Sequence, residues 1–406
     1  MSNYYTYEDF DKLGYSNSTI TTLISVASFI KFIAISTVKY EFVLACFGVI
    51  VNLFHLLILT RKSMGANSVN VVMIGISACD LFNMAFVVYE NSVELLHSNP
   101  DCWTGHGLFN QVVELYGSAI KDDLRRLTPW LGVTMAVIRF LIVKNSLNPK
   151  FKFLSQPKFS WITILITLVL STCWSLFYFA RLMLVETKPW TPAPYCTGFP
   201  ANYTESQYTL TMNPEFLSNA VLMIQIYLIT DGFLKVFNFN AEANNNNRKI
   251  QIIPTIMFPI LTFLLIRELK EAETARRKIS GAVQSKNENS RSDHTTNLVI
   301  LMTVTFMTAE GPLGVIYVIQ GFVASYSGYL NLTLDLADIL GLFVALNAIT
   351  HCVICLTVSS QYRRTVRDVF ICKMCKGKGA STIIVTAKVS VSSMTPIQDA
   401  ALKNQV

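Results

Sequence analysis

The chain has 406 residues, of which 52% are hydrophobic and 15% are charged, and its formal net charge is +7. Soluble globular proteins carry about 25% charged residues, so this composition, with a mean hydropathy of +0.42, excludes an ordinary soluble domain. Apolar runs long enough to cross a bilayer recur along the chain. The sequence therefore predicts an all-α, multi-pass membrane protein embedded in a lipid bilayer.

Residues 1–41 are predicted to form an extracellular tail, in which the apolar segment 20–38 is interrupted by Lys31. We interpret that segment as an interfacial helix or as an extension of the first span. Seven spans are predicted, at residues 42–60, 67–89, 119–143, 160–184, 250–266, 297–322 and 336–358. They form a seven-transmembrane receptor domain over residues 42–358, with residues 90–118 as an outer loop.

An amphipathic helix is predicted after the last span, at residues 359–375, with Tyr362, Val366 and Phe370 facing the membrane. The remaining residues, 376–406, are rich in Ser and Thr and are predicted to be a disordered cytoplasmic tail.

The third span is the unusual one, because it carries charged residues at one end: KDDLRRLTPWLGVTMAVIRFLIVK, residues 121–144. Helical spacing puts five residues on one face: Lys121, Arg125, Thr128, Gly132 and Met135. Lipid does not tolerate such a face, so we expect it to line a protein interior or a water-filled cavity. Two simpler interpretations remain open. Asp122 and Arg126 form a pair four residues apart, or Thr128 caps a helix beginning at Pro129.

The segment 185–249 contains an apolar patch at residues 220–229, followed by Asp231. About ten residues are too few to cross a bilayer, so we place this patch outside the membrane. An eighth span at 220–237 would also move Asn331 into the cytosol.

Two independent signals orient the spans with the N-terminus outside and the C-terminus inside, as expected at the plasma membrane. Lys and Arg concentrate in the loops predicted to be cytoplasmic. The three Asn-x-Ser/Thr glycosylation acceptors all fall in outer segments: Asn17, Asn202 and Asn331.

Among the nine cysteines, Cys102 and Cys196 are the two in outer segments, where the environment is oxidising. A bridge between them would tie the long outer loop to the third span. Cys372 and Cys375 follow the amphipathic helix and are plausible palmitoylation sites, with unmodified thiols as the alternative.

Catalytic and nucleotide-binding motifs are absent from the sequence. His55 and His351 lie in different predicted spans without a partner at a catalytic spacing. The basic residues lie in particular loops, which does not indicate a nucleic-acid partner. We therefore expect no enzymatic activity, no cofactor and no metal site.

Asp80 is an acid within the second span, which indicates an ion or proton site or a carboxylate satisfied by neighbours. Asn52 and Asn347 are candidates to join it. Pro259 and Pro312 are expected to kink their helices, since each removes a backbone hydrogen bond.

Several stretches together resemble rhodopsin-like G-protein-coupled receptors: NLFHLLILTRKSM (52–64), RRLTPWLGVTMAVIRFLIVKN (125–145), IIPTIMFPILTFLLIREL (252–269), EGPLGVIYVIQG (310–321) and NAITHCVICLTVSSQYR (347–363). More narrowly, the chain resembles the nematode serpentine receptor class W family and the related FMRFamide and myosuppressin receptors. The resemblance implies a G-protein contact for Arg139 and switch or structural roles for a further set: Asn52, Asp80, Pro259, Pro312, Asn347, His351 and Tyr362. It also implies the Cys102–Cys196 bridge.

The sequence departs from that pattern at four places. Cys102 lies further upstream of Arg139 than in most rhodopsin-like receptors. Ile138 precedes Arg139 where an acid is usual, His351–Cys355 replaces Asn-Pro-x-x-Tyr, and Ala309–Pro312 replaces Cys-Trp-x-Pro.

The resemblance and the acid-rich outer segments predict a receptor for a FMRFamide-like or other basic neuropeptide, coupled to a heterotrimeric G protein. The candidate ligand-binding residues are Glu114, Lys121, Asp122, Arg125 and Arg126. The alternatives are a chemosensory receptor for a small molecule and, from another class, a seven-span ligand-gated cation channel with its N-terminus inside.

Overall fold

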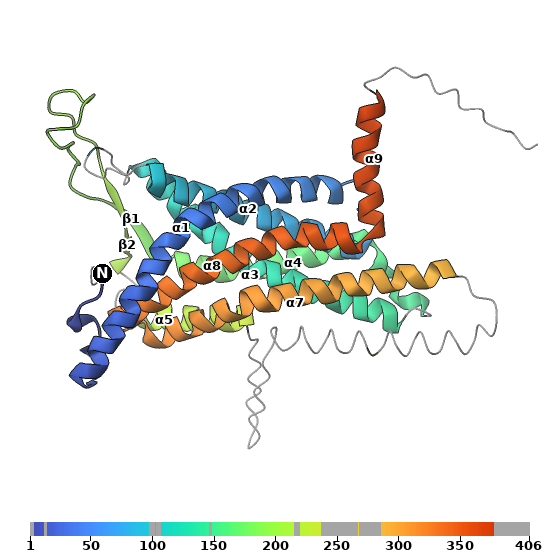
Figure 1. Ribbon diagram of the computed structural model, residues 1–406, viewed down its shortest axis with the longest axis horizontal. Coiled ribbons are helices and arrows are strands. Elements are labelled where there is room, and N and C mark those ends of the chain that lie inside the picture. The colour runs from blue at the N-terminus through green and yellow to red at the C-terminus, as the bar shows by residue number, and fades with distance from the viewer. Residues whose placement is uncertain are drawn as a thin grey trace, which may run out of the picture. The chain divides into compact units, whose positions relative to one another are not determined.

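The computed structural model describes residues 4–11, 14–96, 102, 107–145, 148–214, 220–236, 267 and 286–376. Contacts divide the chain into two compact units, Met1–Val366 and Arg367–Val406. The first unit is built from long helices that run side by side (Figure 1).

The elements of the described residues follow one another as a helical bundle with one small hairpin. The α-helices are α1 (Asn17–Leu59), α2 (Ser68–Leu96), α3 (Leu108–Lys144), α4 (Pro157–Phe179), α5 (Ala220–Val236), α7 (Lys286–Val323), α8 (Ser327–Val358) and α9 (Ser360–Lys376). Two 3-10 helices, η1 (Tyr7–Asp9) and η3 (Pro149–Ser155), lie before α1 and α4. Strands β1 (Leu182–Glu186) and β2 (Tyr208–Met212) pair antiparallel, with Leu182 opposite Met212.

Five helices of the described residues are long and apolar enough to cross a membrane: Asn17–Leu59, Ser68–Val93, Pro157–Phe177, Val304–Val323 and Ser327–Val358. In the first unit α1 packs against α2 and α8, α3 against α2 and α4, and α7 against α5 and α8. Large apolar side chains of α1 and α4, such as Ile50 and Leu170, are exposed in the bundle, as expected for helices that face lipid.

Helix α1 is longer than the first predicted span. Ser16 caps it, its hydroxyl accepting from the Thr19 amide, and the helix continues to Leu59 without a break. The segment 20–38 is therefore an extension of the first span rather than a separate interfacial helix. Lys31, which interrupts the apolar pattern, pairs with Asp335 of α8 at 2.8 Å.

Much of the predicted outer segment at residues 90–118 is helical. Helix α2 continues to Leu96 and α3 begins at Leu108, so Glu114 lies on a helix, with its side chain exposed. The second predicted glycosylation site, Asn202, lies in a loop with a positive φ of 63°. Asn331, predicted in a loop, lies instead near the start of α8.

The apolar patch at residues 220–229 was predicted to lie outside the membrane, but it is part of a helix of the bundle, α5. This helix packs against α7 and also contacts α3 and α4, and it lies beside α7 in Figure 1. Tyr227 and Asp231 of α5 are buried in the bundle. The predicted fifth span at 250–266, with Pro259, and the predicted tail beyond 376 lie outside the described residues.

Tyr362 also differs from its prediction as a membrane-facing residue of the amphipathic helix. Its side chain is fully buried in the first unit, and its hydroxyl lies 2.9 Å from Nδ1 of His55 on α1. Phe370 of α9 is exposed, and Cys372 and Cys375 lie on the same helix.

Candidate functional site

Arg126 of α3 is the centre of a buried polar cluster between three helices. Its Nε donates to Asp231 Oδ1 at 2.5 Å, and its Nη2 donates to the Tyr227 hydroxyl at 2.7 Å, both on α5. Its Nη1 donates to α4, to the Ser171 carbonyl and hydroxyl at 3.2 and 3.3 Å and to the Ser175 hydroxyl at 3.0 Å. Because the side chain is only 2% exposed, this charge is satisfied entirely within the protein.

The structure rules out one of the two simpler interpretations of the third span. Pro129 lies inside α3, so Thr128 does not cap a helix there. Its hydroxyl instead donates to the Leu124 carbonyl at 3.0 Å, within the same helix. Arg126 forms its salt bridge with Asp231, 105 positions away, and Asp122 adds an electrostatic attraction. On the predicted face of α3, Thr128 is buried and Lys121 and Arg125 are partly buried.

Asp123, which sequence reasoning passed over, is the buried acid of this stretch. It accepts from the Thr172 hydroxyl at 2.6 Å, and its carbonyl accepts from Ser171 at 3.2 Å. Asp123 thus anchors α3 to α4. Its position next to Asp122 in the sequence gives no sign of this, because adjacent helical residues point in different directions.

Lys121 and Arg125 belong to a second charged group on the other side of α3. Lys121 pairs with Glu90 of α2, and its ammonium lies 5.7 Å from the centre of the Phe86 ring. Arg125 interacts electrostatically with Tyr317 and Glu310 of α7, as well as with Asp122 and Glu41.

Two further acids extend this group across the bundle. Glu41 of α1 interacts with Lys121, Arg125 and Glu90, and its Oε1 lies 3.2 Å from the position of a Cβ at Gly341 on α8. Asp338 of α8 interacts with Glu41 and Lys121. We call the set Glu41, Glu90, Lys121, Asp122, Arg125, Glu310 and Asp338 the interior charge group. Glu114, predicted as a member, instead accepts from Gln111 within its own helix at 3.2 Å.

Asp80 of α2 lies in a separate buried site near the middle of the bundle. Nδ1 of His351 on α8 is 2.8 Å from Asp80 Oδ2, and the His351 ring packs against Phe306 of α7. Asn52 donates to the Gly48 carbonyl at 3.0 Å. Among the described residues no hydrogen bond joins Asn52 or Asn347 to Asp80, so the predicted three-residue network is replaced by an Asp–His contact.

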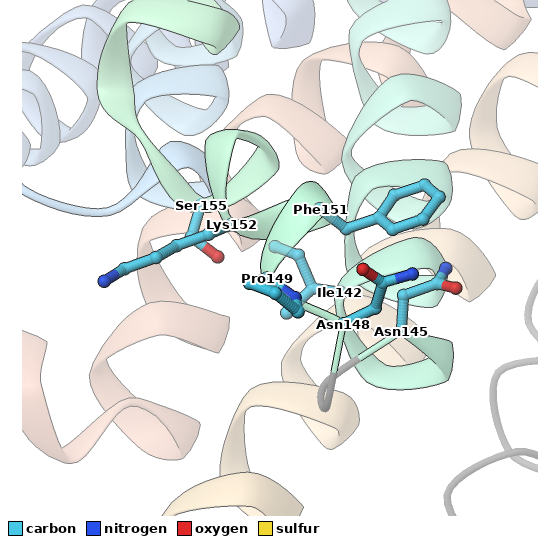
Figure 2. A pocket seen from close by; sticks show the side chains of 7 residues that line it. All are labelled: Ile142, Asn145, Asn148, Pro149, Phe151, Lys152 and Ser155. Atoms are coloured by element: carbon cyan, nitrogen blue, oxygen red, sulfur yellow. The ribbon is translucent and has the colours of Figure 1, made fainter.

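The opposite end of α3 carries Arg139, whose Nε is buried without a hydrogen-bond partner among the described residues. Beside this end, α3 and η3 enclose a hollow of about 390 Å³, lined by Ile142, Asn145, Asn148, Pro149, Phe151, Lys152 and Ser155. Figure 2 shows Asn145 and Asn148 together on one side of it and Lys152 on the other.

Cys102 and Cys196 form a disulfide, with 5.5 Å between their Cα atoms. Cys196 lies in the connection between β1 and β2. The strand β1 follows α4 closely, and β2 contacts α3. The bridge therefore links the segment before α3 to the hairpin connection, as predicted. We call this the disulfide end of the bundle.

The sequence model of the serpentine type 7TM GPCR chemoreceptor family Srw matches residues 39–373. The chain belongs to this family. The Srw match covers the second half of α1, all of α2 to α8 and most of α9, and the family is a class of receptors rather than enzymes. With helices that cross the membrane, this Srw chain is a multi-pass protein of the plasma membrane.

Two curated proteins are similar to this Srw receptor. The G-protein coupled receptor dmsr-1 of Caenorhabditis elegans is 20% identical over 81% of the chain and 66% of its own length. The Sex peptide receptor of Drosophila melanogaster is 21% identical over 82% of the chain and 72% of its own length. The chain thus spans about two thirds of the length of dmsr-1.

Proposed function

We propose that this chain is a cell-surface receptor with its disulfide end outside the cell, and that it couples a basic peptide ligand to a heterotrimeric G protein. The observation that carries the proposal is the inward-facing charge of α3, in a chain whose family consists of receptors. Charged residues inside a membrane bundle mark ligand or ion sites by default, since burying them is otherwise unfavourable.

The sign of the interior charge group supports a cationic ligand. The group contains five acidic side chains, Glu41, Glu90, Asp122, Glu310 and Asp338, beside the basic Lys121 and Arg125. Acidic groups raise the local concentration of cations. The name of the Sex peptide receptor points to a peptide as the ligand.

A small-molecule cue is the second candidate, because the family is described as one of chemoreceptors. The seven-span cation channel has less support, since both curated relatives bear the names of receptors. Both receptor proposals include coupling to a G protein, and they differ in the ligand that the interior charge group binds.

The proposed coupling to a G protein can be tested by substituting Arg139. It lies near the end of α3 opposite the disulfide end, and Ile142, three residues later, lines the hollow at η3. Ligand binding acts on the G protein only through a difference in affinity between two packings of the helices, and Arg139 would meet the G protein in one of them.

The experiment is a screen of amidated basic peptides in cells that express the chain with a promiscuous G protein. We expect one or more arginine-containing peptides to activate it, and replacing that arginine with uncharged citrulline to reduce potency by about tenfold or more. At matched surface expression, Arg139→Ala should abolish the response. A full response in Arg139→Ala would contradict its role, and activation by small apolar compounds alone would favour the second candidate.

A further inference from the structure

The segment before α1 folds against the bundle as a built element. Tyr5 and Phe10 are 5% and 0% exposed, and they form an apolar cluster with Ile20 and Ala27 of α1. Tyr329 of α8 joins it, with its ring perpendicular to Phe10 at 5.1 Å between centroids. Residues 4–11, called the N-terminal strap here, therefore cover a seam between α1 and α8.

One buried carboxylate holds the strap at this seam. Asp335 of α8 accepts from the Tyr5 hydroxyl at 2.6 Å through Oδ2, and from Lys31 at 2.8 Å through Oδ1. The Asp335 side chain is 3% exposed. Burial, together with the bond to Asp335, raises the pKa of the Tyr5 hydroxyl above its ordinary value, so Tyr5 remains a donor at neutral pH.

Shape complements these bonds at Gly328 of α8. A Cβ there would lie 2.4 Å from the Asp9 carbonyl oxygen and 2.8 Å from the Asp9 carbonyl carbon. Only glycine lets the strap backbone approach this closely. The strap also has its own structure, because Asp9 accepts from the Thr6 amide at 2.8 Å and from the Thr6 hydroxyl.

We propose that the N-terminal strap is a latched lid over the seam between α1 and α8, with Asp335 as the latch. Opening the lid would expose Asp335, which interacts electrostatically with Asp338 of the interior charge group. A positively charged group that reached Asp335 would compete with Tyr5 and favour the open form. This last step rests on the proposed function, whereas the latch does not.

The test measures the opening of the lid with a buried reporter in the purified full-length chain. Ala27→Cys places a thiol under the strap, because Ala27 is fully buried. The rate of maleimide labelling in detergent, corrected for the chain without the added cysteine, reports how often the strap opens. Tyr5→Phe removes the latch bond, and Gly328→Ala pushes the strap away without changing a polar group.

We expect each variant to raise the labelling rate about tenfold. Tyr5→Phe removes a hydrogen bond to a buried carboxylate, which contributes enough free energy for that factor. Gly328→Ala places a Cβ against the backbone of Asp9. Two controls should leave it unchanged: Tyr4→Phe, whose ring is exposed, and Gly311→Ala, whose Cβ would meet nothing within 4 Å. Equal rates in all four variants, or fast labelling of the parent reporter, would overturn the latch. Repeating the measurement on intact cells with an impermeant maleimide separates the latch from the orientation: labelling in detergent alone would contradict the orientation in the proposed function and leave the latch standing.

Discussion

Arg126 of α3 and Asp231 of α5 form a buried ion pair that joins the two helices. Both side chains are at most 3% exposed, so the charges are removed from water and depend on each other. Removing one partner of such a pair leaves an uncompensated buried charge, which costs about 3–5 kcal/mol. A pair of this kind fixes the positions of α3 and α5 relative to each other more than it adds net stability.

We therefore predict that Asp231→Leu lowers the unfolding free energy by about 3–5 kcal/mol, while the double variant Arg126→Met with Asp231→Leu recovers most of the loss. Thermal unfolding of the purified chain in detergent provides the measurement. Glu90→Gln is the matched control, because the Lys121–Glu90 pair is partly exposed and such pairs contribute about 0–1 kcal/mol. Equal losses for Asp231→Leu and Glu90→Gln would contradict the burial of the Arg126 cluster.

At the scale of elements, the contact between α5 and α7 is the point at which the structure departs most from the sequence prediction. Gly321 of α7 allows it: a Cβ there would lie 2.4 Å from Ile229 Cγ1 and 2.9 Å from the Ile229 amide nitrogen, both on α5. The backbone of Ile229 cannot move away from such a Cβ as a flexible side chain can.

Gly321→Ala should consequently destabilise the chain by about 1–3 kcal/mol through overpacking. Gly311→Ala on the same helix meets nothing within 4 Å and should be neutral or stabilise by up to about 1 kcal/mol, because alanine favours helix over glycine. Surface expression and melting temperature of the two variants provide the comparison. If Gly321→Ala were as well tolerated as Gly311→Ala, α5 would not pack against α7 as described.

The sequence did not predict α5 as a helix of the bundle, because the partner of its buried charge lies far away in the sequence. Its apolar run ends just before Asp231, and a carboxylate normally marks the boundary of a span. That carboxylate is neutralised by Arg126, 105 residues earlier, and no local pattern shows such a partner. Lys31 left two interpretations of residues 20–38 open in the same way, because its partner Asp335 is distant in the sequence. The apolar helices α2, α4 and α8 were predicted because their composition alone identifies them, although α8 begins at Ser327 and not at residue 336.

The same limit applies to the candidate site. Asp80 and His351 were each singled out, but the 2.8 Å contact between them follows from the packing of α2 against α8. Glu41, Glu310 and Asp338 were not predicted as site residues, since each is a single acid near apolar sequence and acquires a role only beside α3.

On the scale of the whole molecule, the orientation in the membrane decides whether the proposed receptor can work. Asn17, Asn202 and Asn331 are exposed glycosylation acceptors, and we expect at least Asn17 and Asn202 to carry glycans. Replacing each with Gln should remove one glycan, seen as a stepwise mobility change on gels that enzymatic deglycosylation abolishes. If neither Asn17 nor Asn202 carried a glycan, the result would favour the inverted orientation of the cation channel.

The central claim is that the charged face of α3 lines an interior that is reachable by water from outside the cell. The most direct measurement is the labelling of Lys121→Cys on intact cells with a cationic, membrane-impermeant methanethiosulfonate, compared with Leu170→Cys on α4. Leu170 is 68% exposed in the bundle but faces lipid, where the reagent does not enter. We predict rapid modification of Lys121→Cys and none of Leu170→Cys. An inert Lys121→Cys in a chain delivered normally to the surface would contradict the account.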